Sequence, residues 1–363
     1  MNTNRTILIP VLLVILGIMV WGLFFYSVPY QNEDNIKRDL TEISAESYAL
    51  KKAPDTLLKI NKKFLENISK QVLRPIAIKV KKNKIYISDF GSMTIKSFDK
   101  KGNLLSEIGQ GKGRGPGEFT NIMDFTVADS TIWAVDSQLH RISTFTLGGE
   151  FKNNFNVDQV NNRIIKSGSD LVTLMMTTSS KLFARRTKDG KVIRKFGHFL
   201  QEQSMNFPLL DGWLHSINIG NYIYVPIYGS FIFNFNRSDN VTHIVKTPHG
   251  QGFSVDEVNR KKDGDVQRMS APKTKFENYD LETLNDKIYV YVVKRPIANE
   301  AGEILEKAKY MIDVFEISNG KYSYAYTYYL PFFVNEISLL DHYILYRKKG
   351  RIGAFKRVKA VAD

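Results

Sequence analysis

The sequence has no cysteine among its 363 residues, and it has only three tryptophans and six histidines. The lack of cysteine excludes a disulfide-stapled fold, a thiol enzyme, a lipid anchor on cysteine and every metal site built on thiolates. The chain also lacks the P-loop spacing and the G-x-S-x-G spacing of a nucleophile elbow. No common catalytic motif therefore identifies an activity.

The composition excludes disorder and favours a basic surface. Apolar residues make up 43% and aromatic residues 12%, more than a disordered chain contains. Lys and Arg number 51 against 37 Asp and Glu, for a formal net charge of +14. The densest basic stretches, 79–84 and 347–351, fall where we expect turns on a solvated surface. No nucleic-acid-binding motif accompanies this charge, so we expect no nucleic acid partner.

Only one hydrophobic run is long enough to cross a membrane. Residues 7–26 carry no charge, and as a helix they would extend roughly 30 Å, the thickness of a bilayer core. We predict a tail over 1–6, a transmembrane anchor over 7–27 and a polar tether over 28–54. A cleavable signal peptide is the alternative. The flanking charges leave the orientation open, and we expect a single-pass protein whose main domain is periplasmic or otherwise extracytoplasmic.

After residue 74 short runs rich in Ile, Val, Tyr and Phe alternate with turn residues, which is typical of β-strands. A four-strand pattern recurs six times, and its second strands begin at residues 85, 132, 171, 223, 288 and 344. The sequence therefore predicts an all-β fold, a six-bladed β-propeller of four-stranded blades over 55–363, preceded by one transmembrane helix. A two-sheet sandwich or two smaller β domains are the alternative.

Three features of this repeat lead to finer predictions. The sixth unit ends after three strands, so we expect a strand within 57–65 to close the last blade. Residues 253–276 form a polar, basic insertion that we expect to project from the loop face. Residues 295–309 lengthen a hairpin and favour a short helix around 303–307.

The first two units resemble a known family. Gly109-Gln110-Gly111-Lys112-Gly113-Arg114-Gly115-Pro116-Gly117-Glu118-Phe119 is similar to the loop between blades of NHL-type and bacterial TolB-like six-bladed propellers. Ile85-Tyr86-Ile87-Ser88-Asp89 and Phe98-Asp99-Lys100-Lys101-Gly102 resemble the same family's second strand and its outer hairpin. The resemblance implies a propeller fold in the cell envelope, and it implies no single activity.

Aligning the six units identifies candidate site residues. Eight residues before each second strand stand Ala77, Asp124, Arg163, His215, Asp280 and Glu336. Five of the six can ionise, and we expect them on the innermost strands, at one mouth of the central channel. Asp124, Asp280 and Glu336 supply the oxygen ligands that Ca²⁺ prefers, and His215 could act as a base or a ligand. The alternative is a mixed-charge cluster that holds the blades together.

Two classes of function remain open at this point. The first is a membrane-tethered binding or scaffolding module, whose partner is an envelope protein or a small ligand. The second is a metal-dependent hydrolase or lyase with its site at the channel mouth. A scaffold that faces the cytoplasm follows if the anchor is inverted. Enzyme activity is therefore left undecided by the sequence.

Overall fold

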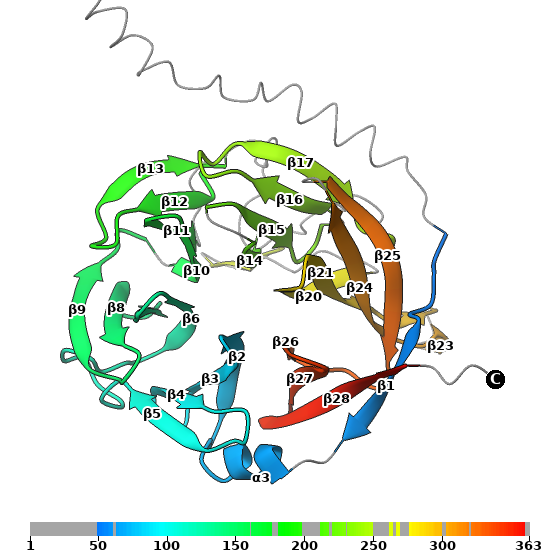
Figure 1. The fold of residues 1–363 in the computed structure, drawn as a ribbon. Helices are drawn as coiled ribbons and strands as arrows, with labels where there is room; N and C mark the ends of the chain where they lie inside the picture. Colours follow the sequence, from blue (N-terminus) through cyan, green and yellow to red (C-terminus); the bar gives the residue numbers. More distant parts are fainter. Residues whose placement is uncertain are drawn as a thin grey trace, which may run out of the picture.

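Six four-stranded antiparallel sheets surround a common centre in the computed structural model (Figure 1). The structure describes residues 49–60, 63–159, 161–175, 181–197, 211–217, 220–229, 231–249, 261–263, 266–268, 276–299, 303–318 and 321–359. The predicted tail, the anchor over 7–27 and most of the tether lie outside these ranges. Within them, no helix is long and apolar enough to cross a bilayer.

Each blade follows the same order from its inner to its outer strand. The first three blades contain β2 (Pro75–Lys81), β3 (Lys84–Asp89), β4 (Thr94–Phe98) and β5 (Leu104–Ile108); β6 (Ile122–Ala128), β7 (Thr131–Asp136), β8 (Arg141–Thr146) and β9 (Phe151–Asn156); β10 (Asn161–Ser167), β11 (Asp170–Met175), β12 (Phe183–Arg186) and β13 (Val192–Phe196). The last three contain β14 (Gly212–Ser216), β15 (Tyr222–Pro226), β16 (Phe231–Phe235) and β17 (Val241–Lys246); β20 (Phe276–Leu284), β21 (Lys287–Lys294), β24 (Lys309–Ser318) and β25 (Lys321–Leu330); β26 (Glu336–Leu340), β27 (Tyr343–Lys348), β28 (Arg351–Lys359) and β1 (Asp55–Ile60). The fold is an all-β, six-bladed propeller.

The sixth blade combines both ends of the described chain. Strand β1 pairs antiparallel with β28, from Asp55 opposite Lys359 to Ile60 opposite Ala354 (Figure 1). The closing strand predicted within 57–65 overlaps β1 over 57–60, and β1 begins two residues before that range. A short helix, α3 (Lys63–Ser69), follows and buries Leu65 and Ile68. This pairing joins the start of the propeller to its end and covers the edge of β28, so that β1 becomes the outer strand of the blade.

The hydrophobic core lies between neighbouring blades. The second and third strands are buried almost throughout, whereas the outer strands β5 and β13 are mostly exposed. Between blades 1 and 2, Tyr86 and Ile95 pack in one cluster with Phe125 and Phe145. Since both faces of every sheet are covered by a neighbouring blade, the inner and middle strands are apolar in nearly continuous runs.

The motif residues of the first two blades fix the connections between blades. Asp89 and Asp136 are fully buried at the ends of the second strands. Asp89 accepts hydrogen bonds from the backbone amides of Leu73 and Arg74, and Asp136 accepts one from the amide of Thr120. Each aspartate therefore holds the segment that enters its own blade.

The glycine-rich loop over 109–119 is held by one arginine. The guanidinium of Arg141 donates to the carbonyl oxygens of Arg114, Gly115 and Glu118. The amide of Phe119 donates to Gly111, and that of Gly113 donates to Phe119. The loop is thus a structural connection between blades 1 and 2, as its lack of P-loop spacing indicates.

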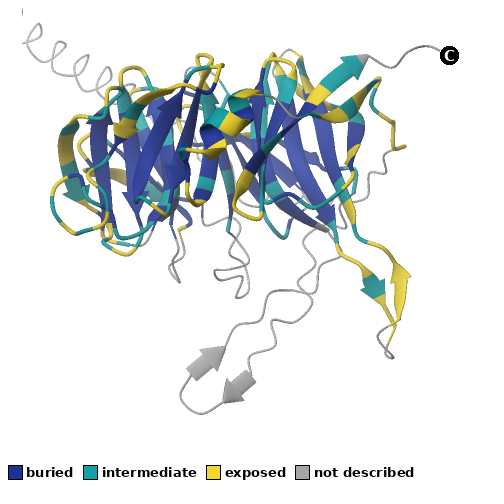
Figure 2. Cartoon of the chain, turned by 90° about the horizontal axis from the view of Figure 1, so that it is seen from below, coloured by how far each residue is buried: buried dark blue, intermediate teal, exposed yellow. Residues whose placement is uncertain are grey.

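The chain has two insertions in this half of the ring. One lies between blades 4 and 5, and the other lies within blade 5, between β21 and β24. Residues 261–263 and 266–268 form the two-stranded pair β18 (Lys261–Asp263) and β19 (Val266–Arg268), and the rest of 253–275 lies outside the described residues. The helix predicted around 303–307 is wrong. Ile297–Ala298 (β22) and Ile304–Glu306 (β23) pair as a hairpin instead, which projects from one face of the disc (Figure 2). Five residues are too few to nucleate a helix without tertiary contacts, whereas the flanking strands β21 and β24 already impose a hairpin.

Candidate functional site

The innermost strands bring the sequence-predicted residues to one level of the ring, with one exception. Ala77, Asp124, Arg163, Asp280 and Glu336 all pair with equivalent residues of the second strands, namely Ser88, Val135, Leu174, Tyr291 and Arg347. In blade 4 the residue at this level is Trp213, which pairs with Val225. His215 pairs with Ile223 and lies one inward-facing position further along β14.

The prediction that His215 belongs to this level is therefore wrong. In the other five blades only two residues separate the paired ends of the inner and second strands, as between Ala128 and Thr131. In blade 4 five residues separate the paired Ser216 and Tyr222. Tyr222 rather than Ile223 is the equivalent of Ile85, because Tyr222 pairs with Phe235 as Ile85 pairs with Phe98. Counting eight residues back from Ile223 therefore stops two residues short of the ring level, which is one step on the same face of a strand.

Three carboxylates at this level clasp the next blade. Asp124 accepts the backbone amide of Ile164 at 2.9 Å, Asp280 accepts that of Ile337 at 2.7 Å, and Glu336 accepts that of Ile78 at 3.0 Å. In each case the amide belongs to the residue that follows the ring position of the next blade. The carboxylates thereby satisfy buried backbone donors at the edges of inner strands, which would otherwise be costly to bury.

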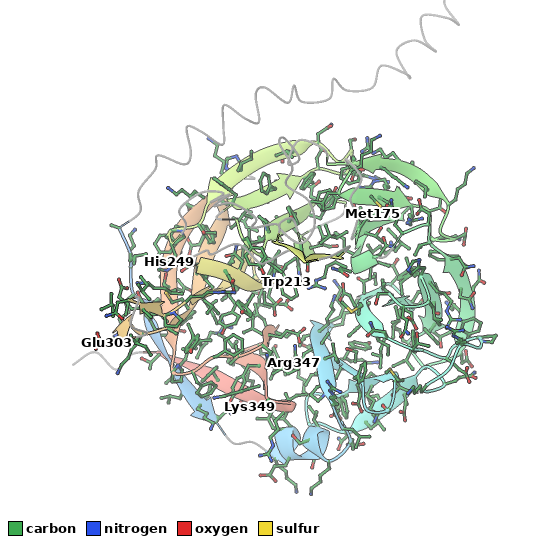
Figure 3. All side chains as sticks on the ribbon, turned by 180° about the vertical axis from the view of Figure 1, so that it is seen from behind. Met175, Trp213, His249, Glu303, Arg347 and Lys349 are labelled. Atoms are coloured by element: carbon green, nitrogen blue, oxygen red, sulfur yellow. The ribbon has the colours of Figure 1, made fainter. Side chains whose placement is uncertain are left out.

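Different chemistry joins the other three pairs of blades. The ammonium group of Lys79 lies 2.7 Å from Asp124 Oδ1, linking blades 1 and 2. The guanidinium of Arg163 stacks 4.1 Å from the ring centroid of Trp213, linking blades 3 and 4. Trp213 in turn donates its indole Nε1–H to the carbonyl of Asn278 at 3.0 Å, linking blades 4 and 5. Figure 3 shows Trp213 and Arg347, the partner of Glu336, near the centre of the disc.

Every interface around the centre is therefore bridged by a polar or cation–π contact, and we call these residues the axial ring (Ala77, Asp124, Arg163, Trp213, Asp280 and Glu336, with Lys79 as the partner of Asp124). The predicted metal ligands Asp124, Asp280 and Glu336 do not converge on one point, since each is directed to a different neighbouring strand. In the described part of the chain, no three His, Asp or Glu side chains are arranged to hold a metal ion. The geometry supports the interpretation that the cluster holds the blades together.

A second polar level lies one step along the inner strands. His215 Nδ1 is 4.0 Å from Glu282 Oε2, and Ser338 donates its hydroxyl to Glu282 Oε1 at 3.3 Å. The side chains of His215, Glu282 and Lys79 are 28%, 14% and 29% exposed, so they contact solvent at the centre of the ring. The carboxylate stands between the hydroxyl and the imidazole, so this is not the hydroxyl–imidazole–carboxylate order of a nucleophilic triad.

The acidic groups near the centre hold their protons unusually firmly. Burial, followed by the charge of Glu336, raises the pKa of Asp280 well above its usual range. Burial and the charge of Asp280 do the same to the pKa of Glu282. Burial raises the pKa of Glu336 to about 7, although Arg347 and the amide of Ile78 oppose the shift. Three carboxyl groups in one enclosed region therefore share fewer than three negative charges near neutral pH.

The pKa of His215 is lowered, whereas the pKa values of the carboxyl groups are raised. Although 28% of its side chain is exposed, the partial burial of His215, followed by the positive charges of Lys79 and Lys81, lowers its pKa to about 3. The imidazole is therefore neutral at physiological pH. Perturbed groups are typical of functional sites, yet they also occur in structural networks, and the direct contacts described above place these groups in such a network.

The sequence analysis missed Trp213, Lys79 and Glu282. Lys79 and Glu282 stand two residues after Ala77 and Asp280, and strand alternation places such pairs on the same face. That periodicity would have identified both residues. Trp213 could be found only with the correct register of blade 4.

A buried imidazole–carboxylate pair joins blades 4 and 5 away from the ring. His249 Nε2 lies 3.0 Å from Asp313 Oδ1, and the side chains are 6% and 0% exposed. The hydroxyl of Thr327 donates to the same carboxylate oxygen at 2.6 Å, and Tyr324 shares a hydrogen bond with Thr327. Since the hydroxyl bonds the carboxylate rather than the imidazole, the pair also lacks the order of a catalytic triad.

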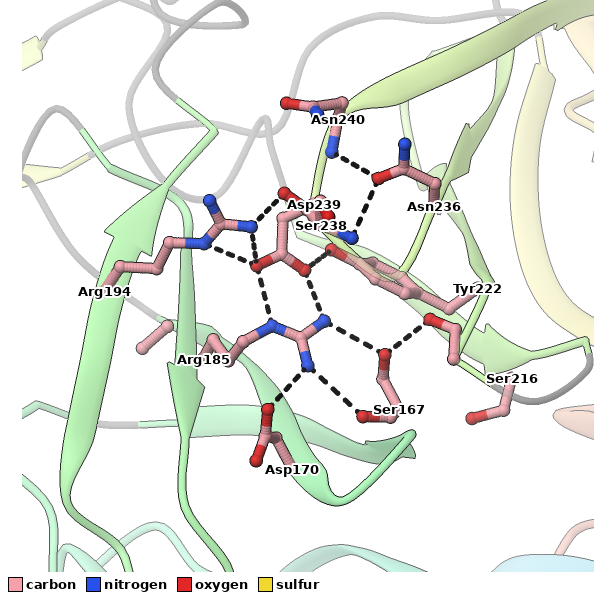
Figure 4. Close-up of polar contacts among 12 residues, drawn as sticks. Ser167, Asp170, Arg185, Arg194, Ser216, Tyr222, Asn236, Ser238, Asp239 and Asn240 are labelled. Atoms are coloured by element: carbon pink, nitrogen blue, oxygen red, sulfur yellow. Dashed lines mark hydrogen bonds and ion pairs between the residues drawn. The ribbon is translucent and has the colours of Figure 1, made fainter. Parts of the chain in front are cut away.

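Blades 3 and 4 are joined by a further buried network near the turn of β16 and β17 (Figure 4). Arg185 donates to both carboxylate oxygens of Asp239, at 2.7 and 2.6 Å. Arg194 and the hydroxyl of Tyr222 donate to the same carboxylate. Arg185 also bonds Ser167 and Asp170 of its own blade. Protein groups supply the hydrogen-bond partners of this network, so we interpret it as a structural contact between blades 3 and 4.

Comparisons with solved structures agree with the fold. A protein of Bacteroides fragilis that is proposed to be exported superposes with a TM-score of 0.55 at 16% identity, over 86% of this chain and 98% of that one. A DUF4221 family member from Bacteroides vulgatus gives 0.52 at 10% identity, over 85% and 97%. Virginiamycin B lyase from Staphylococcus aureus gives 0.47 at 14% identity, over 84% and 100%, too distant to bear on activity.

At these identities the structural likeness shows the fold alone. No curated protein sequence matches the chain. Residues 69–295, which extend from the end of α3 into the fifth blade, match the family DUF5128, described as 6-bladed beta-propeller. This match covers more than half of the chain and agrees with the arrangement of its blades. The chain belongs to this family of six-bladed β-propellers.

Proposed function

We propose that the protein is a membrane-tethered, extracytoplasmic binding or scaffolding module of the cell envelope. The observation that carries the proposal is the projecting hairpin of β22 and β23. Ile304 and Leu305 on β23 are each 64% exposed, the largest exposure among the large apolar residues in the described part of the chain apart from Leu73. Apolar side chains held away from the body of a domain are typical of partner contacts.

The uneven length of the connections supports the same conclusion. In blades 1 to 4 and 6 between two and seven residues separate the second and third strands, whereas fourteen residues separate them in blade 5, where the hairpin is inserted. The ion pair between Lys294 and Glu306 and the hydrogen bonds between Asn299 and Glu303 hold the hairpin in shape. A preformed element loses less conformational entropy when it binds a partner.

The location rests on two further arguments. The uncharged run over 7–26 has the length of a membrane anchor. The superposed protein of Bacteroides fragilis, with its proposed export, has the same fold. The finer assignment to NHL-type or TolB-like propellers stays part of this proposal and rests on the motifs over 85–89 and 109–119.

We do not propose a metal-dependent hydrolase or lyase. The carboxylates that suggested such a site bond backbone amides of neighbouring blades. Their carboxylate oxygens are therefore already engaged by the fold.

Two experiments test the proposal. A reporter that is active only outside the cytoplasm, fused after Asp363, should be active; activity of a cytoplasm-specific reporter at the same position would contradict export.

In cells, a photo-crosslinking residue at Leu305 should give a discrete crosslinked product, and one at Leu58, an exposed leucine of the outer strand β1, should not. Absence of any product at Leu305, or the same product at both positions, would contradict a role of the hairpin in binding.

A further inference from the structure

A basic groove lies on the first blade, away from the axial ring and from the hairpin. It has a volume of about 430 Å³ and lies between the turn of β2 and β3 and the turn of β4 and β5. Its lining includes four lysines, one aspartate and one leucine: Lys82, Lys84, Lys100, Lys101, Asp99 and Leu105. This volume lies within the range of about 300–1,000 Å³ that is usual for small-molecule sites.

The groove keeps an excess of positive charge. The carboxylate of Asp99 accepts the backbone amides of Lys101 and Asn103 and the side-chain amide of Asn103, so it is engaged within its own turn. Lys100 pairs with Asp341 of the sixth blade at 2.6 Å. Lys82 and Lys84 have no side-chain hydrogen bond or ion pair within the described ranges and are exposed. Two ammonium groups are therefore available at the rim.

Both turns are rigid. Lys82 and Asn83 have φ values of 46° and 63°, the positive pair of a tight two-residue hairpin turn. The second turn is closed by the hydrogen bond from Gly102 to Asp99, and Asn67 of α3 donates to the carbonyl of Lys101. The lysine backbones therefore do not have to be ordered when a ligand binds, which lowers the entropic cost.

The lining of the groove is mostly apolar. Leu105 is 47% exposed, and the methylene groups of the lysines add to this apolar surface. An inorganic ion would leave this apolar surface in contact with water. A ligand that carries both an anionic group and a short apolar chain fits both parts of the lining.

We propose that this groove binds an anionic amphiphile, a phosphate group carried on an apolar chain as in a lipid headgroup. Lys82 and Lys84 hold the phosphate through charge-assisted hydrogen bonds, and Leu105 contacts the first carbons of the chain. The inference is independent of the role of the hairpin and of the axial ring.

The lack of native cysteine makes a direct test simple. A Leu104→Cys variant of the full chain carries a single thiol beside the groove, which can be labelled with an environment-sensitive dye. The labelled protein is titrated with dihexanoyl phosphatidic acid, dihexanoyl phosphatidylcholine and inorganic phosphate, all in the same non-ionic detergent. We expect saturable binding of phosphatidic acid, at least about tenfold tighter than either of the others.

Matched substitutions separate the site from the general charge. Lys82→Gln with Lys84→Gln should weaken binding of phosphatidic acid at least about tenfold. Lys188→Gln with Lys191→Gln removes the same charge from the exposed turn of β12 and β13 and should change the affinity less than about twofold. Leu105→Ser should weaken the binding of phosphatidic acid and leave the affinity for inorganic phosphate unchanged. Equal unfolding midpoints would show that all variants are folded.

Four results would overturn the proposal. The first is the absence of saturable binding of phosphatidic acid, and the second is an equal loss of affinity in the two double-lysine variants. The third and fourth are an affinity for phosphatidylcholine, or for inorganic phosphate, equal to that for phosphatidic acid. The last result would identify a site for the free anion, to which the apolar lining does not contribute.

Discussion

Arg185 of blade 3 and Asp239 of blade 4 form a two-point hydrogen-bonded ion pair across the blade interface, with distances of 2.7 and 2.6 Å. Their side chains are 6% and 1% exposed. A buried charge is tolerated only when its partner and its other hydrogen bonds are in place. The pair therefore ties the stability of blade 3 to that of blade 4.

Replacing Asp239 by Asn should lower the free energy of unfolding by about 3 kcal/mol, because Arg185 stays buried without its counter-charge. Asp239 has a φ of 58°, a conformation that Asn adopts readily, so the backbone is not strained by the change. Denaturant unfolding of both proteins measures the difference. The control Asp189→Asn, in the exposed turn of β12 and β13, should change stability by less than about 0.5 kcal/mol. Equal effects of the two substitutions would refute the special role of Asp239.

The turn of β8 and β9 gives a second prediction from two adjacent glycines. Gly149 has a φ of 100°, and a Cβ atom there would stand 2.3 Å from the carbonyl oxygen of Glu107 on the preceding blade. Gly149→Ala should therefore destabilise the fold by more than about 1–2 kcal/mol, the cost of the left-handed backbone alone. At Gly148 a Cβ atom meets nothing closer than 3.6 Å. Thermal unfolding should show Gly148→Ala close to the native protein, and a similar loss at both positions would disprove this account of the blade contact.

The raised pKa of Glu336 predicts a dependence of stability on pH. Its pKa is about 7 in the folded protein against 4.5 as the ordinary value, so the folded state binds a proton that the unfolded chain has lost. The contribution of Glu336 to the free energy of unfolding is fully present below about pH 4.5 and is lost as the pH rises through 7. Between pH 5 and 8 the native protein should lose on the order of 2 kcal/mol relative to Glu336→Gln.

The comparison with Glu336→Gln removes this group together with its effect on Asp280 and Glu282, whose pKa values the charge of Glu336 raises. His215 has a lowered pKa and acts in the opposite direction, since its contribution is lost as the pH falls below its ordinary value of 6.5. His215 is present in both proteins, so its effect cancels in the difference. Glu150→Gln, an exposed substitution, should follow the native curve at every pH. A constant difference between native protein and Glu336→Gln across this range would show that Glu336 titrates normally.

The sequence predicted the blades because their signal is local. Runs such as Ile85-Tyr86-Ile87 have strand composition and end at Asp89, whose buried carboxylate organises the entry to the blade. In later blades Met175, Pro226 and Lys294 stand at the ends of the second strands. The motif is lost there, although the strands and their order are retained.

The axial ring could be predicted only in part. Strand spacing was enough to find Asp124 and Glu336, but the partners of these carboxylates are backbone amides of other blades, which leave no trace in side-chain identity. The spacing in blade 4 differs because five residues connect β14 to β15, whereas two residues connect the inner and second strands of the other blades. The sequence alone therefore does not identify Trp213. It assigns His215 to the ring level, although His215 lies one inward-facing position further along β14.

The most direct test of the axial ring is thermal unfolding of Asp124→Ala with Asp280→Ala beside the native protein, each with added Ca²⁺ and with chelator. The two substitutions leave the buried amides of Ile164 and Ile337 without acceptors, at about 1–3 kcal/mol each. A structural ring predicts a lower unfolding midpoint for the variant and no response of either protein to Ca²⁺ or chelator. A midpoint that Ca²⁺ raises in the native protein but not in the variant would contradict the account and show that these carboxylates bind metal.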